Sequence, residues 1–361
     1  MAEQHIELYK KYKPKTWDEL IGQEKTSRSL QSAIVKNKIP TAYLFTGIRG
    51  SGKTSSAFLM AKSINCLNPQ KNGNPCNDCE ICINIDNGSQ IGVNYISMAN
   101  KGSVDDIRQL VGQAKLSQPV KRSVWILDEI HNLSKAAFDA LLIPIEDPRM
   151  PALFIFCSTE IDKIPQTILS RVHARNFTLI DADTMLAHLK KINEKEGLEA
   201  SEESMMTAVR RGRGSVRDTL SAFESVLATE DNIDEDSYNA NLLTAISEHD
   251  LPKVLKAVND AVNNGYDGRD LAEELFSDLR DLLLIVSGVD RSNVGMFPVE
   301  DIKAVSKGFL GRTGVSMVAE EIGDSITHMT LGADSRIHLE IALVKAVSKL
   351  TKLKKLADQK R

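Results

Sequence analysis

Short apolar segments alternate with amphipathic stretches through the first half of the chain. Five of these segments have the length and composition of buried strands, at residues 42–46, 93–97, 123–128, 153–157 and 174–178. Strands that alternate with helices form a parallel sheet covered by helices on both faces. The pattern therefore predicts an α/β fold for residues 1–180.

After residue 181 the apolar positions follow helical spacing only. A small lid domain is expected at residues 181–232, with helices at residues 184–196, 202–211 and 215–229. The acidic stretch 230–236 is interpreted as a linker, because the composition changes there. An all-α domain is predicted at residues 237–361, with helices near residues 251–263, 270–287, 299–307, 316–329 and 337–356.

The composition and the lengths of the apolar runs predict a globular protein that neither spans a membrane nor is exported. A hydrophobic fraction of 42% and a charged fraction of 26% in 361 residues are typical of a globular protein. No apolar run approaches the roughly 20 residues of a membrane-spanning helix, and residues 1–17 lack the apolar core of a signal peptide. We therefore expect a cytoplasmic protein. The net charge of -4 means that any contact with DNA depends on a local basic surface.

Residues 47–54 (GIRGSGKT) fit the phosphate-binding pattern GxxxxGK followed by Ser or Thr, between a predicted strand and a predicted helix. Glycines let the backbone wrap closely and aim its N–H groups at phosphates, and the helix N-terminus adds partial positive charge. Lys53 is expected to reach the β and γ phosphates, and Thr54 to ligate Mg²⁺. The residues predicted to bind the nucleotide are Gly47, Ile48, Arg49, Gly50, Ser51, Gly52, Lys53, Thr54 and Ser55.

Asp128 and Glu129 follow four apolar residues of a predicted strand, at the edge of the sheet where ligands bind in such folds. Asp128 is predicted to hold Mg²⁺, and Glu129 to polarise the water that attacks the γ-phosphate. The alternative is that these acidic residues simply end the strand. His131 has two readings, a local hydrogen bond or a part in catalysis.

Four cysteines form the spacing C-x9-C-x2-C-x2-C, at Cys66, Cys76, Cys79 and Cys82. Four thiolates so closely spaced favour tetrahedral Zn²⁺, and because they leave no position for water the site is expected to be structural. An iron–sulfur cluster is the competing assignment, since spacing alone does not fix the metal. Cys157 lies inside an apolar strand and is expected to be a core residue.

Together these residues resemble the bacterial clamp-loader gamma/tau subunits, which are AAA+ ATPases. The resemblance begins at residues 8–24, a segment that packs around adenine in the family, and includes the phosphate loop, the cysteine insertion and Asp128 to His131. It continues through residues 140–148 (ALLIPIEDP), Ser158-Thr159 and residues 168–171 (ILSR), and residues 265–285 and 336–345 resemble the collar through which the subunits assemble.

The resemblance implies a role for three further residues. Arg171 would present its guanidinium to ATP held by a neighbouring subunit, Thr159 would sense the γ-phosphate, and Arg217 of the lid would reach the phosphates in cis. The alternative for either arginine is an exposed surface residue without a role in catalysis. The implied cofactors are ATP, Mg²⁺ and Zn²⁺. The implied partners are a sliding clamp, other loader subunits in a pentameric ring or spiral, and primer-template DNA.

The chain departs from the family pattern in three places. Val172 stands where the family usually has cysteine, and Ile143-Pro144 replaces a Lys-Thr pair, which puts a proline in a predicted helix at a cost of about 3 kcal/mol unless the helix starts or kinks there. Ser103 stands where the family often has lysine. Lys101 and Arg108 remain as candidates for contacts with the DNA backbone.

The sequence therefore predicts an ATPase motor subunit that opens a clamp and places it on DNA. The alternatives are another AAA+ DNA motor of the branch-migration type, a structural loader subunit without ATP binding, and a zinc-stabilised adapter. The cysteine insertion argues against the first, and intact Lys53, Thr54, Asp128 and Glu129 argue against the second.

Overall fold

The computed structural model describes residues 6–99, 101–116, 118–228, 235–264, 266–289, 302–329 and 334–359. The chain divides into two compact units, Met1–Ala228 and Thr229–Arg361. No helix among the described residues is long and apolar enough to cross a membrane. The expected division of the first unit at residue 181 stays a prediction.

The first unit is built on a five-stranded parallel sheet with the strand order β2-β3-β4-β1-β5. The strands are β1 Ala42–Thr46, β2 Val93–Ser97, β3 Ser123–Asp128, β4 Ala152–Ser158 and β5 His173–Asn176. The predicted α/β fold is confirmed, although β5 begins one residue and ends two residues before its predicted bounds. β1, β3 and β4 are almost wholly buried, as their continuous apolar runs require.

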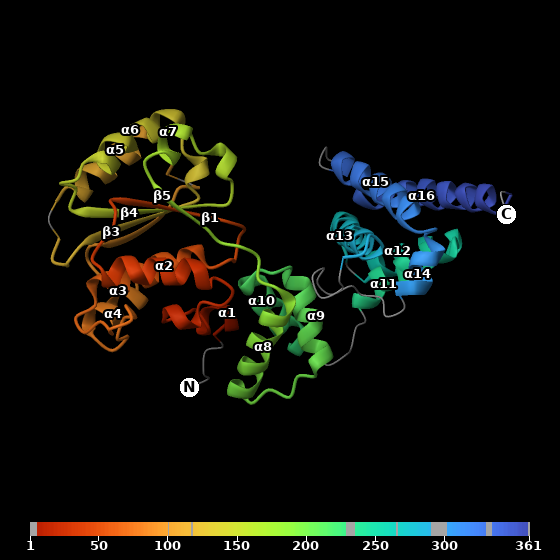
Figure 1. Ribbon diagram of the computed structural model, residues 1–361, viewed down its shortest axis with the longest axis horizontal. Coiled ribbons are helices and arrows are strands. Elements are labelled where there is room, and N and C mark those ends of the chain that lie inside the picture. Colours follow the sequence, from red (N-terminus) through yellow and green to blue (C-terminus); the bar gives the residue numbers. More distant parts are fainter. Residues whose placement is uncertain are drawn as a thin grey trace. The chain divides into compact units, whose positions relative to one another are not determined.

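Helices cover both faces of the sheet (Figure 1). Side chains alternate along each strand, so Leu44 packs into the core under α5 (Val104–Ala114) and α6 (Lys135–Glu146), while Phe45 packs under α2 (Glu24–Val35) and α3 (Lys53–Asn65). The shorter elements are α1 (Leu8–Lys11), α4 (Glu80–Asp86), α7 (Gln166–Leu169) and the 3-10 turns Trp17–Glu19, Ile130–Asn132 and Ile161–Lys163.

Pro144 lies inside α6, as the sequence suggested, but in its last turn. The helix ends two residues later at Glu146, and Asp147 N still donates to Ile143 O at 3.1 Å. Pro144 cannot donate to the carbonyl of residue 140, and only two helical residues follow it.

Three helices complete the first unit, α8 (Ala182–Glu196), α9 (Glu202–Gly212) and α10 (Val216–Ala228). The N-terminal segment binds to them: Leu8 N donates to Glu224 Oε1 at 2.6 Å, and Lys11 Nζ pairs with Glu196 Oε2 at 2.6 Å. These contacts join the start of the chain to residues that lie 216 and 185 positions later in the sequence.

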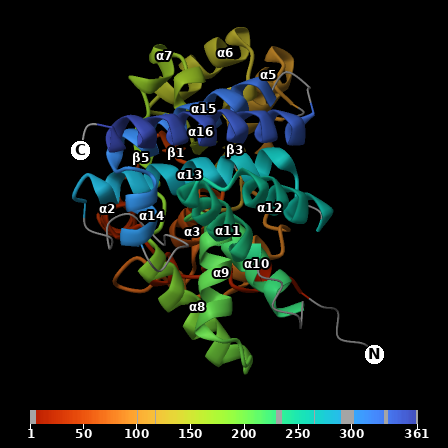
Figure 2. The same ribbon diagram turned by 90° about the vertical axis from the view of Figure 1, so that its right-hand side faces the viewer.

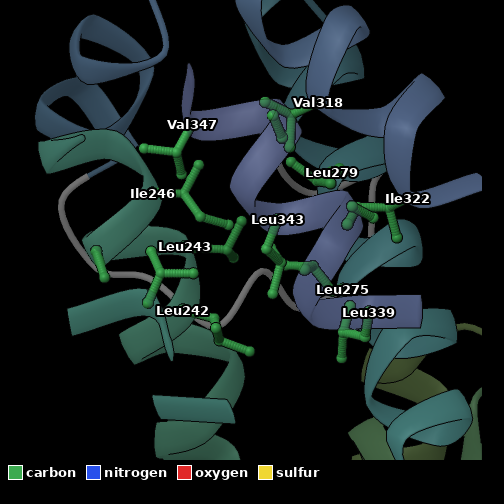
Figure 3. Close-up of a cluster of buried hydrophobic side chains, with 14 of the residues drawn as sticks. Leu242, Leu243, Ile246, Leu275, Leu279, Val318, Ile322, Leu339, Leu343 and Val347 are labelled. Carbon is green, nitrogen blue, oxygen red and sulfur yellow. The ribbon is translucent and has the colours of Figure 1, made fainter. Parts of the chain in front are cut away.

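The described part of the second unit is wholly helical (Figure 2). Its helices are α11 (Glu235–Glu248), α12 (Leu251–Asn263), α13 (Gly268–Val286), α14 (Ile302–Gly308), α15 (Arg312–Met329) and α16 (Ser335–Asp358). α15 and α16 lie side by side, and Leu243, Leu275 and Leu343 point into a shared apolar core (Figure 3).

α11 was not predicted, because the acidic stretch 230–236 was interpreted as a linker. Residues 229–234 lie outside the described residues, but Glu235 and Asp236 already belong to α11. The predicted helix at 299–307 also begins outside the described residues. Its described part agrees with α14.

Candidate nucleotide-binding site and cysteine cluster

The phosphate loop connects β1 to α3, at the edge of the sheet where the parallel strands end. Gly47, Gly50 and Gly52 have positive φ angles of 139°, 74° and 99°. A residue with a Cβ rarely adopts such angles. The glycines therefore allow the chain to turn from strand to helix with its N–H groups facing the space above the sheet.

Lys53 is the first residue of α3 and is 6% exposed. Its ammonium donates to Gly47 O at 2.7 Å and to Ile48 O at 2.6 Å, which holds the side chain against the loop. Burial lowers the pKa of Lys53, and the nearby Asp128 and Glu129 act in the opposite direction. The side chain therefore brings a positive charge to the loop that carries it.

Asp128 ends β3 and is fixed by three donors. Thr54 Oγ1 donates to Asp128 Oδ2 at 2.8 Å, Tyr95 donates to the same oxygen at 3.1 Å, and Glu129 N donates to Oδ1 at 3.0 Å. Burial and the neighbouring Asp128 carboxylate raise the pKa of Tyr95, so this phenol stays a donor. Thr54 and Asp128 thus form the oxygen pair that the sequence predicted for Mg²⁺.

Glu129 adopts φ 56°, in the left-handed region that residues with a Cβ seldom enter. Such strain is found mostly at functional positions, where surrounding contacts hold it in place. Here the turn ends β3 and places the second carboxylate beside the first.

A cavity of about 590 Å³ gathers these groups. Its walls include the loop from Arg49 to Ser55, Asp128, Glu129 and Thr159 from the strand ends, Arg217 from α10, and Tyr9 and Lys13 from the N-terminal segment. Gly47 and Ile48 belong to the loop but do not line the cavity. The structure thus brings together Lys53, Thr54, Ser55, Asp128, Glu129, Thr159 and Arg217, as the sequence predicted.

The two candidate arginines differ in position. The Arg217 guanidinium lies 4.9 Å from the ring centroid of Tyr9, at the cavity wall. Arg171 lies outside the cavity, paired with Glu146 and donating from Nη1 to Thr167 O at 3.0 Å. Arg171 therefore does not reach the nucleotide position of its own chain.

His131 has local partners. Its Nδ1 lies 3.3 Å from Ser158 Oγ, and its Nε2 lies 3.4 Å from Glu160 Oε1. It does not line the cavity. The geometry favours a local structural role over catalysis.

The four cysteines meet between α3 and α4. Their sulfurs all lie within 4.8 Å of one another, with Cys66 Sγ 3.3 Å from Cys76 Sγ and 4.0 Å from Cys79 Sγ. Zn–S bonds of about 2.3 Å in a tetrahedron place sulfurs about 3.8 Å apart, so the cluster fits this ion. Cys157 is fully buried in β4, as a core residue.

Hydrogen bonds favour the thiolate form of one of these cysteines. Burial raises the pKa of Cys79, but hydrogen bonds from the backbone of Leu67 and Cys82 and from the side chains of Cys76 and Cys82 together lower it to about 6. Burial raises the pKa of Cys76 and of Cys82. A thiolate is the form that binds a metal. All four cysteines come from one chain segment, and the cluster is consistent with a zinc site.

The candidate DNA-contact residues flank the start of α5. Lys101 is exposed, and Arg108 Nη1 lies 3.2 Å from Asp105 Oδ1. Ser103 caps the helix by accepting from Asp106 N, in a reciprocal capping box. The serine that departs from the family pattern therefore has a structural role, and Asp105 offsets part of the basic charge.

Sequence reasoning missed Tyr95 and His188, which also line the cavity. Tyr95 had a signal, since β2 is parallel to β3 and its last residues end at the same edge of the sheet. His188 of α8 had none, because only the folded chain brings this helix to the loop.

Comparisons with known proteins find relatives among the subunits of DNA polymerase III. A family model described as "DNA polymerase III, delta subunit" matches residues 22–181. The gamma/tau subunit of DNA polymerase III from Mycobacterium tuberculosis (strain ATCC 25618 / H37Rv) is 31% identical over 354 residues, covering 92% of this chain and 61% of that protein. The tau subunit from Bacillus subtilis (strain 168) is 33% identical over 290 residues, covering 77% of this chain and 51% of that protein.

Among solved structures, the Holliday junction branch migration motor RuvB of Thermotoga maritima has 19% identity and a TM-score of 0.44, covering 73% of this chain and 85% of that one. A likeness this low carries no argument about function. The gamma/tau matches extend over both compact units, beyond the residues that the family model covers. This chain, which spans about three fifths of the length of its mycobacterial relative, belongs to the gamma/tau family of DNA polymerase III subunits.

Proposed function

We propose that the chain is an ATP-hydrolysing subunit of a sliding-clamp loader, which opens the clamp and places it on primer-template DNA. The observation that carries the proposal is the cavity of about 590 Å³ in which Lys53 and Thr54 face Asp128 and Glu129. A subunit that had lost ATP binding would have no reason to keep all four groups in one cavity. Membership of the gamma/tau family supports a sliding clamp and other loader subunits as the partners.

The positions of these groups in the cavity support a separate task for each one. The N–H groups of the loop and Lys53 would hold the β and γ phosphates, and Thr54 and Asp128 would hold Mg²⁺, which neutralises phosphate charge when bound. Glu129 would accept a proton from the attacking water, and Thr159 would orient that water. Arg217 would contact the phosphates from the lid.

Arg171 would act on the nucleotide of a neighbouring subunit. Its distance from the cavity of its own chain supports a role in trans, and its partner Glu146 holds it at the surface. A guanidinium supplied in this way couples hydrolysis to assembly, because the charge of the transferring phosphoryl group is stabilised only at a formed interface.

The domain roles follow from these assignments. Residues 1–180 would form the nucleotide-binding domain, residues 181–232 the lid, and residues 237–361 the collar that assembles the ring or spiral. Lys101 and Arg108 would contact DNA phosphates, so the binding would be salt-sensitive and independent of base order.

The cysteine cluster would hold a structural Zn²⁺. Four sulfurs at tetrahedral distances and the absence of an open coordination position in the cluster support zinc over a catalytic metal. Elemental analysis of the purified chain is expected to find one zinc per chain. Iron together with acid-labile sulfide would instead identify an iron–sulfur cluster.

The function is tested by steady-state ATP hydrolysis of the purified loader, with and without its clamp and primer-template DNA. We expect the clamp and DNA to stimulate the native rate, and Arg171→Ala to abolish the stimulation while nucleotide still binds. Arg149→Ala, which removes another exposed arginine paired with a nearby carboxylate, is the matched control. Turnover that ignores both clamp and DNA would make the chain another AAA+ motor or an adapter.

A further inference from the structure

Tyr95 lies at the cavity wall, and the proposed chemistry does not use it. Its hydroxyl donates to Asp128 Oδ2 at 3.1 Å, the oxygen that also accepts from Thr54 Oγ1 at 2.8 Å. The other carboxylate oxygen accepts from Glu129 N at 3.0 Å. Donors on both oxygens fix the rotation of the carboxylate, because turning it would strain hydrogen bonds on both sides.

The ring of Tyr95 rests on the helix that carries Thr54. Phe58 follows Thr54 by four residues on α3, hence on the same face of the helix. Its ring centroid lies 5.7 Å from that of Tyr95, and Lys13 Nζ lies 4.2 Å from the Phe58 centroid. Tyr95 therefore contacts α3 through its ring and β3 through its hydroxyl, and it links the elements that carry Thr54 and Asp128.

We propose that Tyr95 is a positioning residue for the metal–nucleotide complex, which holds the Asp128 carboxylate in the orientation that receives Mg²⁺ beside Thr54. The inference rests on the proposed function, because it requires a magnesium nucleotide in this cavity. Packing alone would not require a hydroxyl on a side chain that is 48% exposed. The hydroxyl is therefore the part of Tyr95 to remove.

Tyr95→Phe keeps the ring on Phe58 and deletes only the donor to Asp128. ADP is titrated into the purified full chain by calorimetry, with and without Mg²⁺, so that no turnover is needed. Tyr43→Phe is the matched control, since Tyr43 is a buried tyrosine of β1 that does not line the cavity. Asp128→Asn, alone and combined with Tyr95→Phe, tests whether the effect passes through that carboxylate.

We expect Mg²⁺ to strengthen ADP binding to the native chain, and Tyr95→Phe to reduce this enhancement by about three- to tenfold with the metal-free affinity unchanged. A hydrogen bond to a charged group often gives a larger factor, but Tyr95 is half exposed and two donors to Asp128 remain. Tyr43→Phe is expected to match the native chain. In the Asp128→Asn background, Tyr95→Phe is expected to change nothing further.

Two outcomes would overturn the inference while leaving the proposed function intact. An enhancement by Mg²⁺ equal to the native one would show that the hydroxyl does not orient Asp128. Equal weakening with and without Mg²⁺ would show that Tyr95 shapes the cavity instead. If the native chain binds no ADP under either condition, the proposed function fails, and this inference fails with it.

Discussion

Gly50 lies where the phosphate loop contacts Ser215, the residue before α10. Replacing Gly50 tests how closely the loop packs against the start of this helix. Its φ is +74°, and a Cβ placed there would lie 1.9 Å from Ser215 Oγ and 3.0 Å from Ser215 Cβ. Ser215 precedes α10, where its hydroxyl accepts from Asp218 N at 3.3 Å. Arg217 follows two residues later and lines the cavity. Gly50→Ala should therefore disturb both the fold and the nucleotide site.

The expected loss in the free energy of unfolding has a backbone contribution and a steric contribution. A left-handed conformation costs a residue with a Cβ roughly 1–2 kcal/mol. Alanine has no rotamer that avoids the contact, so Ser215 must move, at about 0.5–1.5 kcal/mol for an off-rotamer side chain. We expect Gly50→Ala to lower the free energy of unfolding by about 2–3 kcal/mol. Because moving Ser215 also moves Arg217, ADP affinity should fall by about tenfold, the equivalent of about 1.4 kcal/mol.

A double-mutant cycle with Ser215→Gly separates the steric contribution from the backbone contribution. Ser215→Gly removes both atoms that approach Gly50, and a glycine in place of a serine N-cap costs only a few tenths of a kcal/mol. The double variant should therefore recover the steric part and keep the backbone part, which corresponds to a coupling of about 1 kcal/mol. Urea unfolding and ADP calorimetry on the four proteins measure both quantities.

Gly112→Ala is the matched control, because Gly112 lies within α5 and a Cβ there meets nothing within 4 Å. It should stabilise the chain by about 0.5–1 kcal/mol, the helix preference of alanine over glycine. Additive effects of Gly50→Ala and Ser215→Gly would refute the reasoning. They would mean that the loop and the lid are not in the close contact described.

Two further predictions concern charged groups. Asp86→Asn should lower the free energy of unfolding by about 3 kcal/mol, because it leaves the Lys62 ammonium, 2% exposed, without its partner at 2.8 Å. Lys62→Met should cost less, since Asp86 is half exposed, and equal losses in urea unfolding would contradict this. Burial, followed by Lys191, lowers the pKa of His188, so its contribution to stability is present above about pH 6.5 and is lost as the pH falls. His188→Gln should flatten the pH dependence of unfolding between about pH 7 and 5, and an unchanged slope would argue against it.

The sequence predicted those parts of the site whose residues lie close together along the chain. The glycines and Lys53 lie within eight residues, Asp128 and Glu129 are adjacent, and the cysteine ligands span 17 residues. A buried apolar strand before the glycine loop and another before Glu129 also fixed the positions of these two motifs at one edge of the sheet. The sequence could therefore place these groups together before any tertiary contact was known.

The residues and the helix that the sequence did not predict depend on contacts between distant segments, or on a helix signal that a linker would also show. Tyr95 contacts Asp128 from the neighbouring strand β2, which only the parallel pairing of β2 with β3 indicates, and His188 reaches the cavity from α8, which no sequence signal indicates. α11 was missed for a different reason: its first turn is acidic, and acidic residues favour both a linker and a helix N-terminus. Only the packing of Leu242 and Leu243 into the core distinguishes the two.

The glycines of the phosphate loop belong to a local sequence motif and also contact distant segments of the chain. Positive φ angles explain why each position needs a glycine, but the space around each one shows what the fold gains there. The atoms that a Cβ would meet are Phe177 O at 2.2 Å for Gly47, Ser215 Oγ at 1.9 Å for Gly50 and Leu20 Cδ1 at 3.0 Å for Gly52. These atoms belong to the segment after β5, the start of α10 and the N-terminal segment. Each glycine thus admits one of three segments that close around the loop, so a local motif also specifies the tertiary assembly of the cavity.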